Sequence, residues 1–241
     1  MKDELGERMK RDYEDALRLY VPRRTHVVVR IDGRGFHQFT KKLERPYCRK
    51  LADALDEAAV TLCGEMIGCR FAYGQSDEYS FVLTDTEPHD AALWFDGNVQ
   101  KIVSVSASVF TAAFNSAFRG ETPAAFDSRV LVIAQQCEVE KYLLWRQLDA
   151  SANSLNMLAS AHFSHKELLG KSEPDKHEML HAKGVNWARQ AADFKRGRAV
   201  LRTPDSGWRV DREIPIFNRD QHYLEEALGA GQGTHGARRV L

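Results

Sequence analysis

"CRFAYGQSDEYSFVLT", residues 69–84, is the stretch of the sequence that decides the fold. In its second half, Tyr79, Phe81 and Leu83 alternate with Ser, Val and Thr, which is the period of a β-strand. The group Gly74-Gln75-Ser76-Asp77 interrupts the hydrophobic pattern and consists of residues that favour turns. The stretch therefore predicts two strands joined by a tight turn.

The segments around this hairpin complete a recognisable order. Upstream, residues 26–32 ("HVVVRID") predict a buried strand, and residues 48–66 predict an amphipathic helix. Downstream, a long helix is expected over about 90–118 and a further strand over 127–134. The order strand, helix, strand, strand, helix, strand is that of the ferredoxin-like βαββαβ core, so the predicted fold class is α+β.

Further helices are expected on both sides of this core. An apolar stripe predicts a helix over 3–20, and the expected elements after the core are helices near 137–149, 151–169 and 175–195 and a late strand over 198–203. We expect one domain, with a core and its N-terminal helix in residues 1–135 and a helical part packed on it in residues 136–241. The Gly-rich end, from about residue 229, is expected to be flexible.

The bulk composition excludes several classes of protein. Lys+Arg and Asp+Glu are equal at 34 each, so any binding of nucleic acid must come from a local basic patch. The four cysteines are scattered without a C-x-x-C pair, which argues against a zinc site and against a disulfide framework. The N-terminus is charged, unlike a signal peptide, and no apolar run is long enough to span a bilayer. We expect a cytoplasmic protein with no membrane contact.

The predicted topology brings acidic residues together. The third strand lies between the first and second and runs antiparallel to both, so its N-terminal end neighbours the C-terminal end of the first strand. Asp32 lies at the first of these ends, and Asp77 and Glu78 lie at the second. Adjacent carboxylates favour a divalent cation between them, and oxygen ligands favour Mg²⁺. Two such ions about 4 Å apart would suit a nucleotidyl transfer, and Gly33 and Gly35 leave room for a triphosphate.

Each of these motifs also has an ordinary structural explanation. An isolated Asp-Gly after a strand is usually only a turn, and an isolated Ser-Asp-Glu in a hairpin is usually only solvated. The prediction of a metal-dependent nucleotidyltransferase therefore depends on both motifs lying at adjacent ends of one sheet.

Several longer motifs occur in a fixed order along the chain: "RIDGRGFHQF" (30–39), "YGQSDEYSFVL" (73–83), "KIVSVSAS" (101–108), "FDSRVLVIA" (126–134), "YLLWRQLDASANSLN" (142–156) and "DKHEML" (175–180). Together they resemble the tRNA-His guanylyltransferase family and its bacterial and archaeal guanylyltransferase-like relatives. The resemblance implies a fold similar to the palm domain of polymerases. It also implies addition of nucleotides to the 5′ end of tRNA in the 3′-to-5′ direction, after activation of the 5′-phosphate by ATP or GTP.

The resemblance also implies roles for individual residues. Asp32 and Asp77 would bind two Mg²⁺ ions through their side chains, and Gly33 would bind through its carbonyl. Glu78 would act electrostatically, and Lys101 would contact phosphate. The residues expected to bind the nucleoside triphosphate are Asp32, Gly33, Arg34, Gly35, Phe36, His37, Arg45, Ser76, Asp77 and Lys101.

The chain departs from the family pattern at three places. Ser151-Ala152-Asn153-Ser154 stands where eukaryotic members carry H-I-N-N, and Arg45-Pro46-Tyr47-Cys48 stands where the family has K-P-N-D. Asn98 stands in place of an arginine of the long helix. The first departure places the chain in the guanylyltransferase-like branch, which prefers templated repair of truncated tRNA 5′ ends.

A tRNA substrate requires cationic side chains that contact its phosphates, and one segment of the chain has a local excess of basic residues. The segment "RQAADFKRGRAVLR" (189–202) has five basic residues and one acid. The candidate RNA contacts are Arg129, Arg146, Lys176, Arg189, Lys195, Arg196, Arg198 and Arg202. The alternative for each of them is a solvated or internally paired charge. His177 and His181 are spaced to share a metal on a helix, but the sequence offers no third ligand.

The resemblance further implies a homodimer or a homotetramer. Two rival functions remain open at the level of sequence. The first is another nucleotidyl transfer at the same site, such as RNA 5′-adenylylation linked to ligation or cyclisation of a nucleotide. The second is RNA binding without catalysis.

Overall fold

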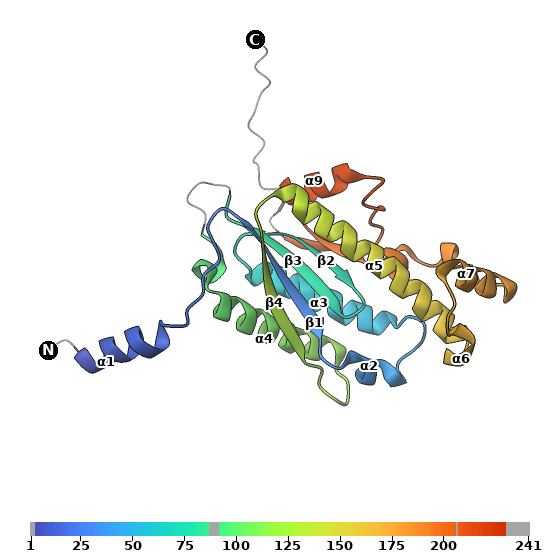
Figure 1. The fold of residues 1–241 in the computed structure, drawn as a ribbon, viewed down its shortest axis with the longest axis horizontal. Coiled ribbons are helices and arrows are strands. Elements are labelled where there is room, and N and C mark those ends of the chain that lie inside the picture. Colours follow the sequence, from blue (N-terminus) through green and yellow to red (C-terminus); the bar gives the residue numbers. More distant parts are fainter. Residues whose placement is uncertain (1–2, 87–91, 206, 230–241) are drawn as a thin grey trace, which may run out of the picture.

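A computed structural model describes residues 3–86, 92–205 and 207–229 of the chain. Within these residues the strands form one antiparallel sheet of six strands in the order β4-β1-β3-β2-β5-β6 (Figure 1). The strands are β1 (His26–Gly33), β2 (Cys69–Gln75), β3 (Glu78–Thr84), β4 (Phe126–Ile133), β5 (Arg198–Arg202) and β6 (Trp208–Asp211).

The predicted ferredoxin-like core is confirmed. Strand β3 lies between β1 and β2, and β4 pairs with the other edge of β1. Helix α3 (Arg49–Glu65) connects β1 to β2, and α4 (Val99–Phe118) lies between β3 and β4 in the chain. The fold is therefore α+β, with two further strands, β5 and β6, added beside β2.

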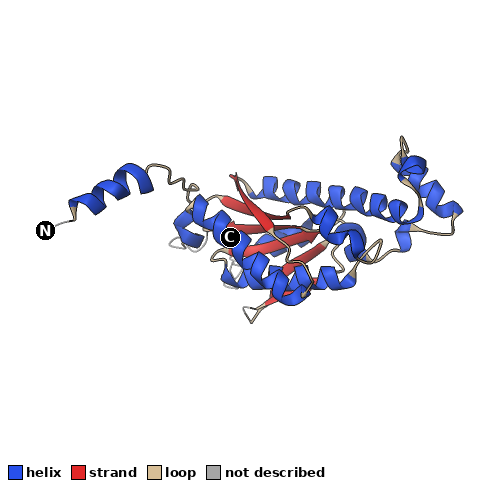
Figure 2. Ribbon diagram, turned by 90° about the horizontal axis from the view of Figure 1, so that it is seen from below, coloured by secondary structure: helices blue, strands red, loops and turns tan. Residues whose placement is uncertain are grey.

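Both faces of the sheet are covered, which explains why β1 is a continuous hydrophobic run. Val27, Val29 and Ile31 point to one face and pack in the same buried cluster as the apolar sides of α3 and α4. Val28 points to the other face and belongs to a second cluster with residues of α5 (Gln136–His162) and α9 (Gln221–Gly229). Figure 2 shows the sheet between these two layers of helices.

Helix α5 is the longest element and extends beyond the sheet (Figure 1). Its C-terminal half packs against α7 (Glu173–Ala182) and α8 (Ala192–Arg196) through a third buried cluster, which includes Leu155, Leu158, Leu180 and Phe194. Short α6 (His165–Leu168) lies between α5 and α7 in the chain. The third cluster fixes the C-terminal half of α5 where the helix extends beyond the sheet.

The helix predicted over 3–20 is shorter than expected. The chain forms α1 (Glu4–Met9) and one wider π-helical turn (Lys10–Glu14), and both project away from the sheet (Figure 1). The apolar stripe that suggested a longer helix is solvent-exposed, with Leu5 at 60% and Leu17 at 75%. An amphipathic helix takes most of its stability from packing, and this stripe has no core of its own chain to contact.

Several other boundaries also differ from the prediction. Helix α4 begins at Val99, after a 3₁₀ turn (Trp94–Gly97), because Asn98 caps its first turn by accepting a hydrogen bond from the Lys101 amide. The two helices expected over 137–149 and 151–169 are the single helix α5, followed by α6. The helix expected over 175–195 is divided into α7, a short turn (Trp187–Arg189) and α8.

The last part of the chain was only partly predicted. The late strand is confirmed as β5, whereas β6 and α9 were not expected. The Gly-rich tail beyond residue 229 lies outside the described residues. None of the helices in the described ranges has the length and apolar character needed to cross a membrane.

Candidate active site

The pairing of β1 with β3 brings the predicted acidic residues together. Asp32, near the end of β1, lies directly opposite Glu78, the first residue of β3. Asp77 precedes Glu78 in the turn between β2 and β3. Residues 45 or 46 positions apart in the sequence therefore meet at one end of the sheet, as the strand order predicted.

The hairpin turn holds Asp77 against the end of β1. Ser76 adopts a left-handed backbone conformation with φ at 49°, and its hydroxyl donates a 2.9 Å hydrogen bond to Asp77 Oδ1. A Cβ atom added at Gly33 would lie 2.6 Å from Asp77 Oδ2 and would also overlap the ring of Phe36. Glycine is therefore required at position 33 for this close approach.

The two carboxylates of the site are not electrostatically independent. Burial raises the pKa of the Asp77 carboxyl, and the nearby charge of Asp32 raises it further against the hydrogen bond from Ser76. A cation between Asp32 and Asp77 would remove this repulsion and stabilise both ionised forms.

The groups at this end of the sheet suit Mg²⁺ better than a metal ion that requires three or more side-chain ligands. Among the described residues, no group of three or more His, Cys, Asp or Glu side chains is arranged to hold a metal ion. Asp32 and Asp77 supply carboxylates, and Gly33 lies beside them with its backbone. Mg²⁺ commonly uses one or two carboxylates and takes its other ligands from water and substrate phosphates. This donor set is therefore compatible with the predicted ion.

The loop after β1 forms one wall of the site. Gly35 has a φ of 67° and leads into the single turn of α2 (Phe36–Phe39). The Phe36 ring is buried and packs on Phe114 and Phe126, with ring centroids 6.0 and 5.0 Å away. This anchor fixes the loop, while Arg34, Gly35 and His37 remain exposed.

A cavity of about 710 Å³ opens beside the loop and the hairpin turn. Its size lies within the usual range for sites that bind small molecules. Its walls come from the loop after β1, residues 43–48, the start of α3, the hairpin turn and the C-terminal half of α5. The residues that line it are Gly33, Gly35, Phe36, His37, Thr40, Leu43, Glu44, Arg45, Pro46, Tyr47, Cys48, Leu51, Ala52, Leu55, Ser76, Asp77, Asn153, Asn156, Met157, Ser160, Ala161 and Arg198.

The wall formed by α5 was not predicted from the sequence. Asn153, Asn156, Met157 and Ser160 are spaced three or four residues apart, so they share one face of the helix. The Oδ1 atom of Asn156 accepts a 2.8 Å hydrogen bond from Lys176, which links this wall to α7. The spacing of these four residues was already visible in the helix expected over 151–169, but the sequence did not show that this face of the helix lies beside the acidic end of the sheet.

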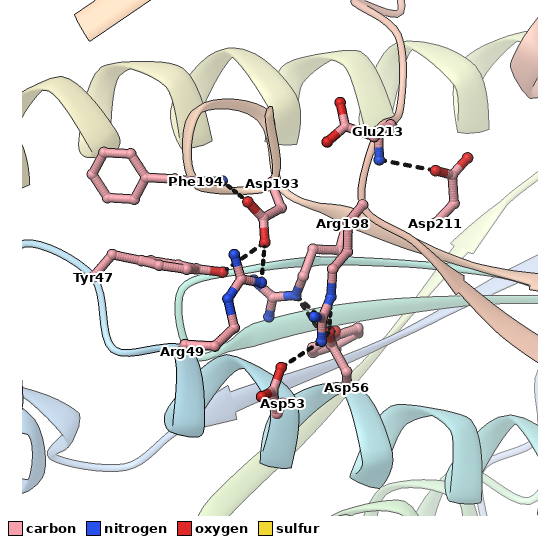
Figure 3. A network of polar contacts seen from close by, with 11 residues as sticks. Tyr47, Arg49, Asp53, Asp56, Asp193, Phe194, Arg198, Asp211 and Glu213 are labelled. Carbon is pink, nitrogen blue, oxygen red and sulfur yellow. Dashed lines mark hydrogen bonds and ion pairs between the residues drawn. The ribbon is translucent and has the colours of Figure 1, made fainter. Parts of the chain in front are cut away.

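A buried polar network forms the back of the cavity (Figure 3). Asp56 of α3, which is 3% exposed, accepts hydrogen bonds from Tyr79, Arg198 and Arg212. Nearby, Asp193 accepts hydrogen bonds from Tyr47 at 3.1 Å and from Arg49 at 2.6 Å. The network joins α3 and β3 to α8, β5 and the segment after β6.

The structure corrects the predicted position of Lys101. The backbone around Asn98 and Val99 pairs with residues 19–20, just before β1 begins. The opposite end of α4 reaches the site, where Phe114 contacts Phe36. Lys101 is therefore roughly 20 Å along the helix from that end, at about 1.5 Å per residue. Within one chain it does not reach the carboxylates, because α4 starts at the end of the sheet where β3 finishes.

Two of the predicted RNA contacts are also corrected. Arg146 is 6% exposed and forms an ion pair with Glu78, and Arg198 is 1% exposed and forms an ion pair with Asp56. Neither guanidinium is available to phosphates on the surface. The sequence could not show this, because the partner carboxylates lie 68 and 142 positions away.

The other candidate RNA contacts differ in their surroundings. Arg189 and Arg202 are exposed, whereas Lys176, Lys195 and Arg196 are partly buried. The side chain of Arg129 is 49% exposed and lies 3.6 Å from Asp32 and 3.2 Å from Asp127. A cation therefore stands immediately beside the acidic site.

His177 and His181 do not form a recognisable metal site. The ring of His177 contacts the ring of Trp187 edge to face, with centroids 5.5 Å apart. The described part of the chain contains no group of three metal-binding side chains, so the two histidines have no third side-chain ligand there.

Comparisons with known proteins agree with this geometry. The sequence profile of the tRNAHis guanylyltransferase family matches residues 6–134. The tRNA(His) guanylyltransferase of Schizosaccharomyces pombe is 32% identical, and the match covers 83% of each chain. Among solved structures, a bacterial tRNA(His) guanylyltransferase-like protein in complex with ATP has a TM-score of 0.88 and 41% identity. A bacterial guanylyltransferase-like protein in complex with GTP has a TM-score of 0.80 and 37% identity. Each structural match covers 93% of this chain and 99% of the other.

More than half of the chain thus matches the family profile, and the structural matches extend over both the acidic site and the long helix α5. The acidic end of the sheet, the cavity beside it and these similarities lead to one conclusion. The chain belongs to the tRNAHis guanylyltransferase family and is a nucleotidyltransferase.

Proposed function

We propose that this chain adds nucleotides to the 5′ end of tRNA in the 3′-to-5′ direction, in a reaction that requires Mg²⁺. The observation that carries the proposal is the meeting of Asp32 and Asp77 beside Gly33, at the edge of a cavity large enough for a nucleotide. The 5′-phosphate would first attack the α-phosphorus of ATP or GTP and release pyrophosphate, which leaves an adenylylated or guanylylated 5′ end. The 3′-hydroxyl of the incoming nucleotide would then attack the 5′-phosphorus of the tRNA, forming a phosphodiester bond and releasing AMP or GMP.

Asp32, Asp77 and the Gly33 carbonyl would hold two Mg²⁺ ions. When bound, these ions would neutralise phosphate charge and align the attacking and leaving oxygens. Ser76 supports this role because its hydroxyl fixes the orientation of the Asp77 carboxylate. The backbone of residues 33–37 and the exposed side chains of Arg34 and His37 would contact the triphosphate, and Arg45 lines the same cavity.

The choice of ATP or GTP as substrates is supported by the similar bacterial proteins, which were solved in complex with these nucleotides. The cavity combines two kinds of surface. Polar groups of the loop and the hairpin turn lie at one end, and apolar side chains such as Leu43, Leu51 and Leu55 lie along another wall. This division suits a triphosphate joined to a base.

Templated repair is the favoured form of the reaction. Residues 151–154 carry Ser-Ala-Asn-Ser in place of H-I-N-N, and Asn153 of this segment lines the cavity. A chain without the H-I-N-N histidine is expected to add the nucleotide that pairs with the opposite strand. Addition of an unpaired guanylate to tRNA-His is then the secondary activity.

The tRNA would approach across the exposed cations. Arg129 stands beside Asp32, and Arg189 and Arg202 are exposed. Contacts of this kind bind phosphate without reading sequence. We also propose that the protein forms a homodimer or a homotetramer, which sedimentation of the purified protein tests directly.

The decisive experiment supplies labelled, 5′-truncated tRNAs with each of the four bases at the opposing position, together with Mg²⁺ and all four nucleoside triphosphates. The expected product is a tRNA extended by the complementary nucleotide. A stalled 5′-adenylylated end, or a cyclic nucleotide, would instead identify a different nucleotidyl transfer at the same site. Extension that is unchanged when Mg²⁺ is removed by a chelator would contradict the proposed role of the carboxylates.

A further inference from the structure

Arg198 is a buried arginine in the wall of the cavity. Its Nε atom donates a hydrogen bond to Asp56 and lies 3.3 Å from the Tyr79 hydroxyl. Its Nη2 atom is buried but has no hydrogen-bond partner among the described residues. Because an unpartnered buried N–H loses the hydrogen bond that it would make to water, such an atom is rare and requires an explanation.

The guanidinium lies away from the proposed phosphate end of the cavity. Figure 3 shows Arg198 extending from β5 toward Tyr47 and α3. Its partner Asp56 directly follows Leu55, and both Leu55 and Tyr47 line the cavity. The donor is therefore next to the apolar wall, where a base would lie if the phosphates contact Gly33 and Asp77.

The local charges indicate what kind of atom the donor would meet. The cations Arg49, Arg198 and Arg212 are matched by the anions Asp53, Asp56 and Asp193. A phosphate placed here would add negative charge that nothing in the network balances. A neutral acceptor, such as a ring nitrogen, would satisfy the N–H without disturbing this balance.

We propose that Arg198 contacts the base of the bound purine nucleotide, with Nη2 donating a hydrogen bond to a ring nitrogen. This inference rests on the proposed function, because it assumes that the cavity holds a nucleoside triphosphate. Asp56 and Tyr79 hold the guanidinium through its Nε–H, so the adjacent Nη2 is oriented before the nucleotide binds. Arg198, expected from the sequence to bind RNA on the surface, is thereby assigned to nucleotide recognition.

The test measures calorimetric binding of Mg²⁺-ATP and of its 1-deaza, 3-deaza and 7-deaza analogues, each of which replaces one ring nitrogen by C–H. The wild type is expected to bind one of the three analogues about ten-fold more weakly than ATP, the usual effect of losing a hydrogen bond to a charged donor. Arg198→Lys keeps a cation opposite Asp56 but removes Nη2. It is expected to bind ATP about ten-fold more weakly and to bind that analogue and ATP equally well.

Arg212→Lys is the matched control. Arg212 also donates to Asp56 but is not among the described residues that line the cavity, so its variant should keep the wild-type preference among the analogues. If the wild type binds ATP and all three analogues with equal affinity, the role of Arg198 is overturned but the proposed function is not. This outcome is measured on the wild type, so it does not depend on whether a variant folds. An undiminished preference in Arg198→Lys overturns that role as well. Absence of any nucleotide binding by the wild type overturns the proposed function together with it.

Discussion

Arg146 of α5 donates two hydrogen bonds, each 2.7 Å long, to the two carboxylate oxygens of Glu78. Both side chains are largely buried, with 7% and 10% of their surface exposed. Burial raises the pKa of the Glu78 carboxyl, and the hydrogen bonds and charge of Arg146 oppose that rise. The pair joins α5 to the first residue of β3, which directly follows Asp77. The ion pair between Arg146 and Glu78 therefore helps to fix the position of Asp77.

Removing one partner of this pair should be costly. Arg146→Met removes both hydrogen bonds of the buried Glu78 carboxylate and leaves it only the longer, 3.8 Å ion pair with Arg30, so we expect the free energy of unfolding to fall by about 3 kcal/mol. Arg146→Lys keeps the charge but loses the double hydrogen bond, so a smaller loss is expected. Urea denaturation at neutral pH measures both. Lys141→Gln, which breaks an exposed pair on the same helix, should leave the midpoint unchanged. An equally small effect of Arg146→Met would show that the buried pair contributes nothing to stability.

Replacement of the site carboxylates should separate activity from folding. Asp32→Asn and Asp77→Asn are expected to lower the rate of nucleotide addition to a truncated tRNA by roughly a thousand-fold, because several kcal/mol of transition-state stabilisation would be lost. Circular dichroism should be unchanged, since both variants remove mutual repulsion without creating a cavity. Asp127→Asn is the control, because Asp127 lies opposite Asp32 on β4 but is exposed. Full activity of either site variant would rule out the metal assignment.

The sequence predicted the acidic site because strand order determines which strand ends are neighbours. Asp32 and Asp77 could be placed together from hydrophobic periodicity alone, without knowledge of any side-chain contact. Lys101 was predicted from the resemblance instead, and a motif match does not show which end of α4 faces the site. Arg146 and Arg198 were predicted as RNA contacts because they are basic, but the sequence does not show that a distant carboxylate pairs with each of them inside the fold.

Gly33 provides a test of the close approach between β1 and the hairpin turn. In Gly33→Ala the added methyl group would contact Asp77 Oδ2 at 2.6 Å and overlap the Phe36 ring. We expect a loss of stability of about 1–3 kcal/mol and a loss of Mg²⁺-ATP affinity of at least about ten-fold. Gly64→Ala, in α3 with open space around it, should be neutral or stabilising by up to about 1 kcal/mol. Wild-type nucleotide affinity in Gly33→Ala would show that the position of Asp77 does not control binding.

The exposed cations should affect tRNA binding through electrostatics alone. Arg189→Gln is expected to weaken binding of all tRNAs to a similar extent, and to reduce the slope of log affinity against log salt by about 0.7–0.9, the value for one phosphate contact. Fluorescence anisotropy over a range of salt concentrations measures this slope. Lys141→Gln is the control, because Lys141 is exposed but paired with Glu138. A slope unchanged in Arg189→Gln would remove this residue from the RNA surface.

His26 predicts how stability depends on pH. Burial lowers the pKa of His26 below its ordinary value of 6.5, and the charge of Glu140 opposes that shift only in part. The unfolded chain therefore binds a proton more readily than the folded chain, so stability present above pH 6.5 should be lost as the pH falls through the folded pKa. His26→Gln removes this proton uptake. Urea midpoints at about pH 7.5 and about pH 5.5 should therefore differ less in the variant than in the wild type. An equal difference in both proteins would mean that His26 does not contribute to the acid sensitivity of the fold.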